Sequence, residues 1–357
     1  MPKEIIMQNK ATFVTIMAGG IGSRFWPAST RKFPKQFIDI LGMGKSLLQL
    51  TYERFLPLTG PENILILTNE EYRDLVRQQL PDIPVANILC EPSMNNTAPA
   101  IAYAALRLEA LHKDAVFVVT PSDHVILKAE LFRQKIKQAI DFAASRDALV
   151  TLGIQPTRPA TGYGYIHLDK PIEASIYKVK RFVEKPDKTA AEAYISSGNY
   201  LWNAGIFIWS VSSILRAMEQ HTEGILDVLR SADYNTPKEE EFIRKHYPDT
   251  SKISIDYAVL ETAENVYTIP ADIGWSDLGT WNALHAFMEK DKWGNAISSG
   301  QVKLYDATNN LIRVPKGKRV VLKGLNGYII VDEGNTLLIY PKEDEQEIKL
   351  VRTEIVK

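Results

Sequence analysis

The sequence predicts an α/β protein with a mostly parallel sheet, followed by a smaller all-β region. In the first half, apolar runs typical of buried strands alternate with segments that have the length and pattern of helices. This β–α alternation favours a parallel sheet that helices cover on both faces. After Trp293-Gly294, short β-branched runs separated by glycine or asparagine indicate rungs of a β-helix.

The order of the expected elements follows from these runs. Strands are predicted at 12–18, 63–68, 85–90, 115–120 and 148–153. Helices are predicted at 46–56, 70–79, 97–112 and 129–145. Further along, we expect a strand at 176–183, a charged helix near 187–197, a mostly helical region at 211–262, and a loop leading into a helix within 275–290. Rungs are predicted around 310–312, 320–322, 328–331 and 336–339, so we expect one domain over 1–292 and a second over 293–357.

Composition narrows the class of protein. The 357 residues include 42 basic and 43 acidic side chains, and the formal charge of −1 gives no general basic field for nucleic acid or a membrane. Cys90 is the sole cysteine, which excludes an internal disulfide and fits a reducing cytoplasm. Residues 1–10 hold no long apolar core, and no 18-residue apolar run occurs in the chain. We therefore expect a cytoplasmic enzyme with neither nucleic-acid nor membrane partners.

A glycine-rich stretch follows the first predicted strand. Gly19, Gly20 and Gly22 allow the backbone to approach a ligand closely and to turn its N–H groups toward an anion. Arg24 and Lys35 add positive charge nearby. The combination suits a nucleoside triphosphate, and the alternative is an ordinary glycine-rich turn.

Better-known motifs do not fit. Phe25 stands where a dinucleotide fingerprint needs its third glycine. Asp39 stands where a Walker loop ending at Gly44-Lys45-Ser46 needs its first glycine. The histidines show no metal spacing, and neither His-Glu-x-x-His nor Gly-x-Ser-x-Gly occurs. Zinc chemistry and a serine nucleophile therefore have no support, and Cys90 is interpreted as a small core residue.

Two carboxylates are candidate magnesium ligands. Ser122 and Asp123 follow the strand at 115–120, at the sheet edge where ligands of such folds bind. Asp277 lies in Trp275-Ser276-Asp277 and could share one metal with Asp123, because Mg²⁺ takes oxygen ligands and bridges substrate phosphates. The structural alternatives are that Asp123 caps a turn and that Asp277 is the N-cap of a helix running to Met288.

Two segments mix glycine, aromatic and polar side chains in a way that suits a sugar, and a third pairs an acid with an amine. Gly162 lies in Thr-Gly-Tyr-Gly-Tyr, and Asn203 lies in Trp-Asn-Ala-Gly-Ile-Phe. Glu184 and Lys185 precede Pro186, which fixes the backbone and could aim both side chains into a site. The alternatives are core packing for the aromatic strands and a surface ion pair for Glu184 and Lys185.

The segment from Glu91 to Pro99 supplies a candidate base reader. Thr97 is predicted to be the N-cap of the helix that begins there, with Pro99 in its first turn. That leaves Glu91 and Asn96 available, and a carboxylate can accept hydrogen bonds from the N1–H and 2-amino groups of guanine.

Taken together, these motifs resemble the sugar-nucleotide pyrophosphorylases, and among them the mannose-1-phosphate guanylyltransferases. The resemblance rests on motifs in the family's order over residues 19–279. They are Gly-Gly-x-Gly-x-Arg-x-Trp-Pro from Gly19, Pro-Lys-Gln from Pro34, Glu-Pro at Glu91 with Asn-Thr-Ala-Pro from Asn96, Pro-x-Asp-His from Pro121, Gly-Tyr-Gly-Tyr-Ile from Gly162, Glu-Lys-Pro from Glu184, Trp-Asn-Ala-Gly-Ile-Phe from Trp202, Ser-Ile-Asp-Tyr from Ser254, and Trp-Ser-Asp-x-Gly from Trp275.

The resemblance implies a Rossmann-like nucleotidyltransferase domain, a left-handed β-helix-like C-terminal domain, and a reaction. GTP and mannose 1-phosphate would give GDP-mannose and diphosphate by in-line attack on the α-phosphorus, with Mg²⁺ as cofactor. The implied roles are as follows: Asp123 and Asp277 hold the metal; Arg24, Lys35 and Lys185 stabilise charge; Gly19, Gly20, Gly22, Glu91, Asn96, Thr97 and Ser122 bind the nucleotide; and Gly162, Glu184 and Asn203 bind the hexose.

The sequence departs from the family pattern in places and leaves alternatives open. Asn95 and Thr30 stand where the family often has basic residues, so what these two positions contact is open. We expect no isomerase domain after the β region, and therefore no phosphomannose isomerisation. The exposed rungs suggest a homodimer. The alternatives are a pyrophosphorylase for another hexose or for dTTP, and a non-catalytic regulatory paralogue that binds GDP-mannose.

Overall fold

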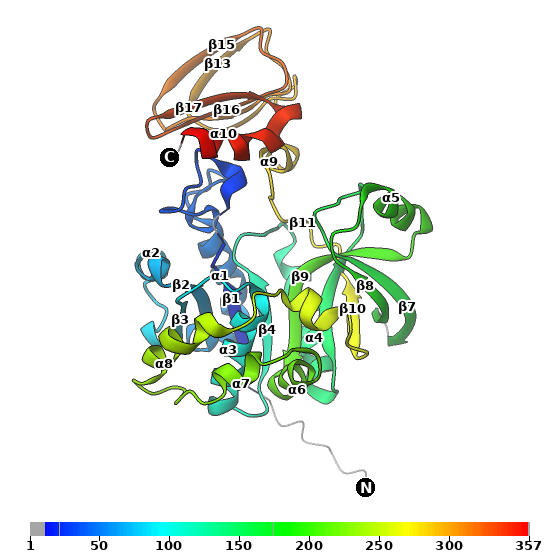
Figure 1. The fold of residues 1–357 in the computed structure, drawn as a ribbon. Coiled ribbons are helices and arrows are strands. Elements are labelled where there is room, and N and C mark those ends of the chain that lie inside the picture. The colour runs from blue at the N-terminus through cyan, green and yellow to red at the C-terminus, as the bar shows by residue number, and fades with distance from the viewer. Residues whose placement is uncertain (1–10, 21, 174, 356–357) are drawn as a thin grey trace. The chain divides into compact units, whose positions relative to one another are not determined.

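The computed structural model describes residues 11–20, 22–173 and 175–355 (Figure 1). Residues 1–10, where the sequence predicts no targeting segment, lie outside the described residues. The chain divides into two compact units. The sheet unit comprises the residues up to Gly19, Arg54–Pro121 and Ile126–Trp275, and the rung unit comprises Gly20–Glu53, Ser122–Val125 and the residues from Ser276 onward. Within the described residues, no helix is long and apolar enough to cross a membrane.

The sheet unit is built on a nine-stranded sheet of order β3-β2-β1-β4-β9-β6-β10-β8-β7. The strands are β1 (Thr12–Met17), β2 (Ile64–Asn69), β3 (Ile88–Glu91), β4 (Val116–Pro121), β6 (Leu149–Ile154), β7 (Tyr165–Glu173), β8 (Ile176–Val183), β9 (Tyr200–Ser210) and β10 (Val266–Pro270). Strands β9 and β8 run opposite to the others. The register of the parallel part places Val14 beside Ile64 and Val118. The predicted mostly parallel sheet is confirmed.

Helices pack on this sheet because its strands are apolar on both faces. The helices are α2 (Arg73–Gln79), α3 (Thr97–Leu111), α4 (Ala129–Ser145), α5 (Lys188–Ser197), α6 (Val211–His221), α7 (Ile225–Leu229) and α8 (Glu239–His246). One core cluster joins Phe13, Phe117 and Trp209 of the strands to α3, α6 and α7. Alternate strand residues such as Val14 point the other way, and α4 buries Phe132 and Ile136 against β4, β6 and β9.

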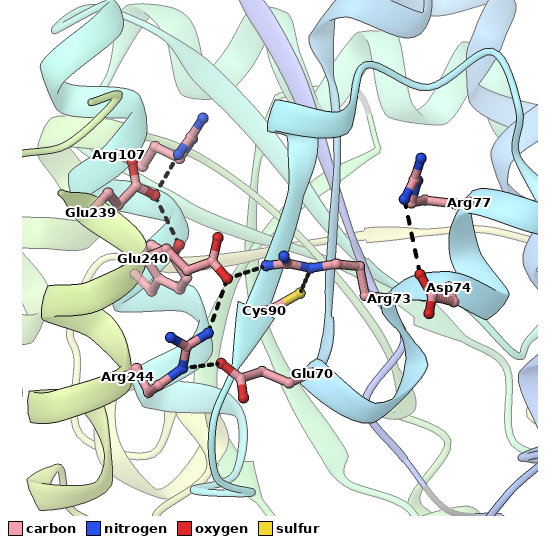
Figure 2. Close-up of polar contacts among 10 residues, drawn as sticks. Glu70, Arg73, Asp74, Arg77, Cys90, Arg107, Glu239, Glu240 and Arg244 are labelled. Atoms are coloured by element: carbon pink, nitrogen blue, oxygen red, sulfur yellow. Dashed lines mark hydrogen bonds and ion pairs between the residues drawn. The ribbon is translucent and has the colours of Figure 1, made fainter. Parts of the chain in front are cut away.

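A network of ion pairs attaches α8 to its neighbours in the sheet unit (Figure 2). Glu239 accepts from Arg107 and from the Tyr103 hydroxyl, and both partners come from α3. Glu240 accepts from Arg73 of α2 at 2.8 Å. The Arg73 Nε–H also donates to the sulfur of Cys90 at 3.1 Å. Cys90 is buried, as the sequence predicts.

The rung unit contains stacked strands. These are β12 (Ala296–Ser299), β13 (Gln301–Tyr305), β14 (Leu311–Arg313), β15 (Arg319–Lys323), β16 (Tyr328–Glu333) and β17 (Thr336–Pro341). Strands β12, β14 and β16 pair in parallel, as do β13 and β15, which is the arrangement of β-helix rungs. Strand β17 closes the sheet in antiparallel register with β16. The unit also holds α9 (Trp281–Phe287), η8 (Lys342–Glu347) and α10 (Ile348–Ile355). Three further elements are each divided between the two units, namely α1 (Leu47–Thr59), β5 (Val125–Ile126) and β11 (Trp275–Ser276).

Several element predictions need correction. The strand predicted at 85–90 begins at Ile88, because Val85–Asn87 form a 3₁₀ turn after Pro84. The region after 300 is not all β, since η8 and α10 follow β17. Strand β10 was not predicted, and it pairs with β6 and β8 in the interior of the sheet. The two units do not coincide with a boundary at 292/293, and a separate domain over 293–357 stays a prediction.

Candidate functional site: a phosphate turn and two ligand clusters

The glycine turn of the rung unit packs directly on Lys35. Gly22 has φ of 63°, and a Cβ added there would lie 2.5 Å from the Cβ of Lys35, so no larger residue fits. The Gln36 amide donates to the Gly20 carbonyl at 2.9 Å and ties the turn to the Pro34-Lys35-Gln36 segment. A Cβ at Gly20 would meet nothing within 4 Å, so its backbone faces open space. The turn therefore offers open backbone next to a buried cation.

Lys35 joins the two candidate metal-binding aspartates. Its ammonium donates to Asp123 Oδ2 at 2.9 Å and to the backbone carbonyl of Asp277 at 2.7 Å. The Lys35 side chain is 5% exposed and that of Asp123 is 33% exposed. Burial favours the protonated acid, but Lys35 and His124 outweigh it and hold the pKa of Asp123 below its ordinary value. The Asp123 carboxylate is thus ionised and partly open to solvent.

Asp277 does not cap the following helix, so the structural alternative considered for this residue is excluded. The N-cap of α9 is Thr280, whose hydroxyl accepts from Ala283 N–H at 3.2 Å. Asp277 instead accepts from Gly279 N–H at 3.1 Å. A Cβ at Gly279 would lie 2.6 Å from Asp277 Oδ2 and 3.2 Å from Arg24 Nη1, so the carboxylate and the guanidinium flank this glycine.

The rung unit therefore gathers Arg24, Lys35, Asp123 and Asp277. Arg24 is exposed in the 3₁₀ turn Ser23–Phe25. Ser122 is buried, and its carbonyl accepts from Thr51 Oγ1 at 3.1 Å. Among the described residues, no group of three or more His, Cys, Asp or Glu side chains could hold a metal ion. Two carboxylates are nevertheless sufficient for Mg²⁺, which commonly uses one or two of them together with substrate phosphates.

A second cluster, in the sheet unit, lies at the end of β3. Glu91 is 9% exposed, and its Oε2 would lie 3.4 Å from a Cβ at Gly19. The Tyr247 hydroxyl donates to its Oε1. Burial raises the pKa of Glu91 to about 7, although the Tyr247 hydrogen bond opposes this rise.

The prediction that Thr97 is the N-cap of α3 is wrong, because Asn96 fills that position. Asn96 has φ of 70° and ψ of −169°, a strained conformation for a residue other than glycine, and its Oδ1 accepts from Thr97 N–H at 2.9 Å. Thr97 is the first helical residue, and its hydroxyl accepts from Ile255 N–H at 2.8 Å. Asn95 is fully buried, and its amide donates to the Tyr247 carbonyl at 3.1 Å and to the Thr250 carbonyl at 3.1 Å. A basic side chain at position 95 could not replace this compact set of bonds.

A third cluster, also in the sheet unit, joins Glu184, Lys185 and Asn203 to Asp256. The Asn203 amide donates to Asp256 Oδ1 at 3.1 Å and accepts from Thr151 Oγ1 at 3.0 Å, which fixes its orientation. Lys185 has φ of 49° and donates to Glu184. Burial and the neighbouring Glu184 raise the pKa of Asp256 to about 7.

The glycines of the third cluster differ in their surroundings. A Cβ at Gly164 would lie 2.5 Å from Glu184 Oε2, so a larger residue there would displace the Glu184 carboxylate. A Cβ at Gly162 would meet nothing within 4 Å. The structure thus places Gly162 beside open space, where the backbone can approach a ligand.

Sequence reasoning missed Asp256 and Tyr247. Asp256 belongs to the Ser-Ile-Asp-Tyr motif, which is part of the family resemblance but gives no indication of the role of its aspartate. Tyr247 lies between His246 and Pro248 and carries no motif. Its position beside Glu91 depends on a contact between distant parts of the chain, and no local pattern encodes such a contact.

Comparison with known proteins identifies the family. The chain belongs to the nucleotidyl transferase family, whose sequence model matches residues 14–293. It is 36% identical over 359 residues to mannose-1-phosphate guanylyltransferase 2 of Escherichia coli O157:H7, covering 97% of this chain and 73% of that protein. It is 37% identical over 343 residues to mannose-1-phosphate guanylyltransferase of Salmonella muenchen, covering 94% of this chain and 72% of that protein.

A solved structure extends the comparison to the fold. The crystal structure described as mannose-1-phosphate geranyltransferase from Thermus thermophilus matches with a TM-score of 0.87 and 31% sequence identity. The match covers 97% of this chain and 100% of that one. The resemblance inferred from the motifs is therefore confirmed for the family and for the fold.

Proposed function

We propose that this protein transfers the guanylyl group of GTP to mannose 1-phosphate and releases diphosphate, giving GDP-mannose. The names of its relatives in Escherichia coli O157:H7 and Salmonella muenchen support this assignment. The observation that carries it is the ammonium of Lys35, which bonds both Asp123 and Asp277 beneath the glycine turn. A buried cation beside a glycine turn that has open space at Gly20 suits the binding of phosphate groups.

The proposed step is an in-line substitution. A phosphate oxygen of mannose 1-phosphate forms a bond to the α-phosphorus of GTP, and the bond from that phosphorus to the diphosphate oxygen breaks. The protein supplies position and positive charge, and no covalent intermediate is required. Lys35 stabilises charge at the reacting phosphate, while Arg24 and the backbone of Gly20 and Gly22 hold the departing diphosphate.

Mg²⁺ is the proposed cofactor, with Asp123 and Asp277 as its protein ligands. The chemistry of these donors fits, because both are carboxylates and the Asp123 carboxylate is held ionised and partly exposed. When bound, the ion would neutralise charge on the α-phosphate. Lys35 takes part in the same arrangement by keeping both aspartate segments in place.

The sheet unit carries the proposed recognition groups. Glu91 accepts hydrogen bonds from the N1–H and 2-amino groups of guanine. Gly19, Asn96 and Thr97 are the other nucleotide contacts proposed in the sheet unit, and Ser122 is one proposed separately in the rung unit. Glu184, Asn203 and the open backbone at Gly162 bind hexose hydroxyl groups, and Lys185 binds the sugar phosphate.

The experiment is a panel of diphosphate-release assays. The protein is incubated with GTP, ATP or dTTP and with mannose 1-phosphate or glucose 1-phosphate, with and without Mg²⁺. The expected result is rapid release with GTP, mannose 1-phosphate and Mg²⁺, and little release when any one is replaced or omitted. Faster release with another pair would favour a pyrophosphorylase for that pair. Binding of GDP-mannose without release from any pair would favour a regulatory paralogue.

We further propose a cytoplasmic location and a homodimer. A single buried cysteine is compatible with a reducing compartment. Light scattering of the purified protein tests the dimer, and fractionation of cells tests the location.

A further inference from the structure

Within the part of the chain that the structure describes, Tyr247 is the one residue that hydrogen-bonds the carboxylate of the proposed base reader Glu91. Its Oε1 accepts the Tyr247 hydroxyl, while its Oε2 faces Gly19 at the start of the glycine turn. A carboxylate has about four acceptor positions, so Tyr247 occupies one and leaves others for a ligand. The hydrogen bond fixes the plane of the carboxylate, which otherwise turns freely about its last bond.

Tyr247 is itself fixed within the sheet unit. The side chain is fully buried, and its ring packs edge-on against Tyr103 with 6.5 Å between ring centroids. The Asn95 amide donates to its backbone carbonyl at 3.1 Å. Tyr247 directly follows α8, and Glu239 at the start of that helix binds Arg107 and Tyr103 (Figure 2). The phenol therefore cannot move independently of the surrounding core.

We propose that Tyr247 is a positioning residue for guanine recognition, which orients the Glu91 carboxylate toward the base and sets the affinity for GTP. This inference rests on the proposed function, in which Glu91 reads guanine. It adds a specificity-determining residue that touches no substrate atom and acts through Glu91 alone.

The chemistry of guanine explains why such positioning matters. The N1–H and 2-amino groups are adjacent donors in one plane, so a carboxylate must be coplanar with them and ionised to accept both. A protonated carboxyl group loses an acceptor position and adds a donor, which opposes a donor of the base. Glu91 therefore needs a partner that favours its charged form at neutral pH.

The groups around Glu91 identify Tyr247 as that partner. The Glu91 carboxylate faces the phenol of Tyr247, which lies in the turn after α8, and the backbone of Gly19. Tyr103 packs against the Tyr247 ring, and the Tyr103 hydroxyl donates to Glu239. Burial and Glu91 itself raise the pKa of Tyr247 well above its ordinary value, so the phenol remains a donor at neutral pH. Loss of this donor raises the pKa of Glu91 further above about 7.

The test compares Tyr247→Phe with wild-type protein by equilibrium binding of GTP from pH 6 to pH 9, without mannose 1-phosphate. Titration of the GTP phosphates affects both proteins equally, so it drops out of the ratio of the two affinities at each pH. Loss of a hydrogen bond to a charged group is expected to move the pH midpoint of binding up by about one unit. The GTP affinity of Tyr247→Phe relative to wild type should then increase about fivefold from pH 7 to pH 9, and the loss that remains at pH 9 measures the misorientation of the carboxylate.

Two further variants serve as controls. Tyr234→Phe removes another tyrosine hydroxyl, which donates to the Leu229 carbonyl at 2.8 Å and packs near the same Tyr103 ring. It should leave the pH midpoint unchanged. Glu91→Gln cannot ionise, so its GTP binding should lack the midpoint near pH 7. Thermal unfolding of each variant establishes that the proteins are folded.

The outcomes separate this inference from the proposed function. Wild-type affinity for GTP in Tyr247→Phe at both pH 7 and pH 9 would overturn the positioning role. Equal wild-type affinity for GTP and inosine triphosphate, which lacks the 2-amino group, would also overturn it, because Glu91 would then not read that group. If the pH shift occurs but no diphosphate is released with mannose 1-phosphate, the inference stands and the proposed transfer reaction fails.

Discussion

Replacement of Glu91 by glutamine should stabilise the fold at alkaline pH while weakening the binding of GTP. Glu91 is 9% exposed, and burial raises its pKa from an ordinary 4.5 to about 7. Because the folded state binds this proton more tightly than the unfolded chain, the unfolding free energy falls as pH rises between 4.5 and 7. The full penalty is therefore present above pH 7 and absent below 4.5.

The magnitude follows from the pKa difference. Each pKa unit corresponds to about 1.4 kcal/mol, so ionised Glu91 destabilises the folded state by about 3 kcal/mol at pH 8.5 and by less than about 1 kcal/mol at pH 5. Glutamine has nearly the same shape, and its carbonyl can still accept the Tyr247 hydroxyl. Its amide offers donors where guanine also offers donors, so GTP affinity should fall at least about tenfold.

The assay is urea unfolding followed by tryptophan fluorescence, for wild type and Glu91→Gln, at pH 5 and pH 8.5. The stability of the variant relative to wild type should increase by about 2 to 3 kcal/mol between the two pH values. Glu130→Gln serves as the matched control, because Glu130 is exposed on α4 and its ion pair with Arg133 contributes little. A difference between Glu91→Gln and wild type that is the same at both pH values would refute the raised pKa of Glu91.

Other substitutions test the remaining clusters. Asp123→Ala should fold normally and lose roughly 10²–10³-fold in turnover, equivalent to about 2.7–4 kcal/mol of barrier, and wild-type turnover would rule out its metal role. Gly22→Ala should lower the melting temperature and the activity together, because its Cβ would lie 2.5 Å from Lys35 at a φ of 63°; a fully stable and active variant would contradict this packing. Asn203→Ala should raise KM for mannose 1-phosphate about tenfold and leave GTP affinity unchanged, as equilibrium binding of GTP would show; an equal loss for both substrates would place Asn203 outside the hexose site.

Much of the fold could be predicted because its strands are continuous apolar runs. Strands such as β1, β2 and β4 are buried on both faces, so their burial is visible in the local sequence. Strand β10 reads Val-Tyr-Thr-Ile-Pro, which is short and mixed, and pairing with β6 and β8 specifies it as a strand. Strand limits near prolines were less predictable, because Pro84 allowed Val85–Asn87 to form a turn.

The local structural roles of the candidate site residues were harder to predict than their residue types, and their functional roles stay predictions. Asn96 and Thr97 both suit a helix N-cap, and the left-handed backbone at Asn96 decides between them. Asp277 and Thr280 present the same ambiguity at α9. The double contact of Lys35 with Asp123 and Asp277 joins residues far apart in the chain, so sequence spacing could not reveal it.

Several hydrogen bonds and one ion pair of the sheet unit keep Tyr247 in contact with the buried carboxylate of Glu91. A penalty of about 3 kcal/mol is a large part of the roughly 5–15 kcal/mol by which a folded domain is usually stable. A less buried glutamate would avoid this penalty, but its contact with a base would be weakened by water. The buried arrangement persists because Asn95 holds the backbone of Tyr247, and because α8 is fixed to α3 through Glu239 and Arg107.

Breaking the pair between Glu239 and Arg107 should therefore weaken GTP binding without touching the ligand, because Tyr247 would no longer be held against Glu91. Equilibrium binding of GTP to Arg107→Gln measures this effect, and an unchanged affinity would contradict it.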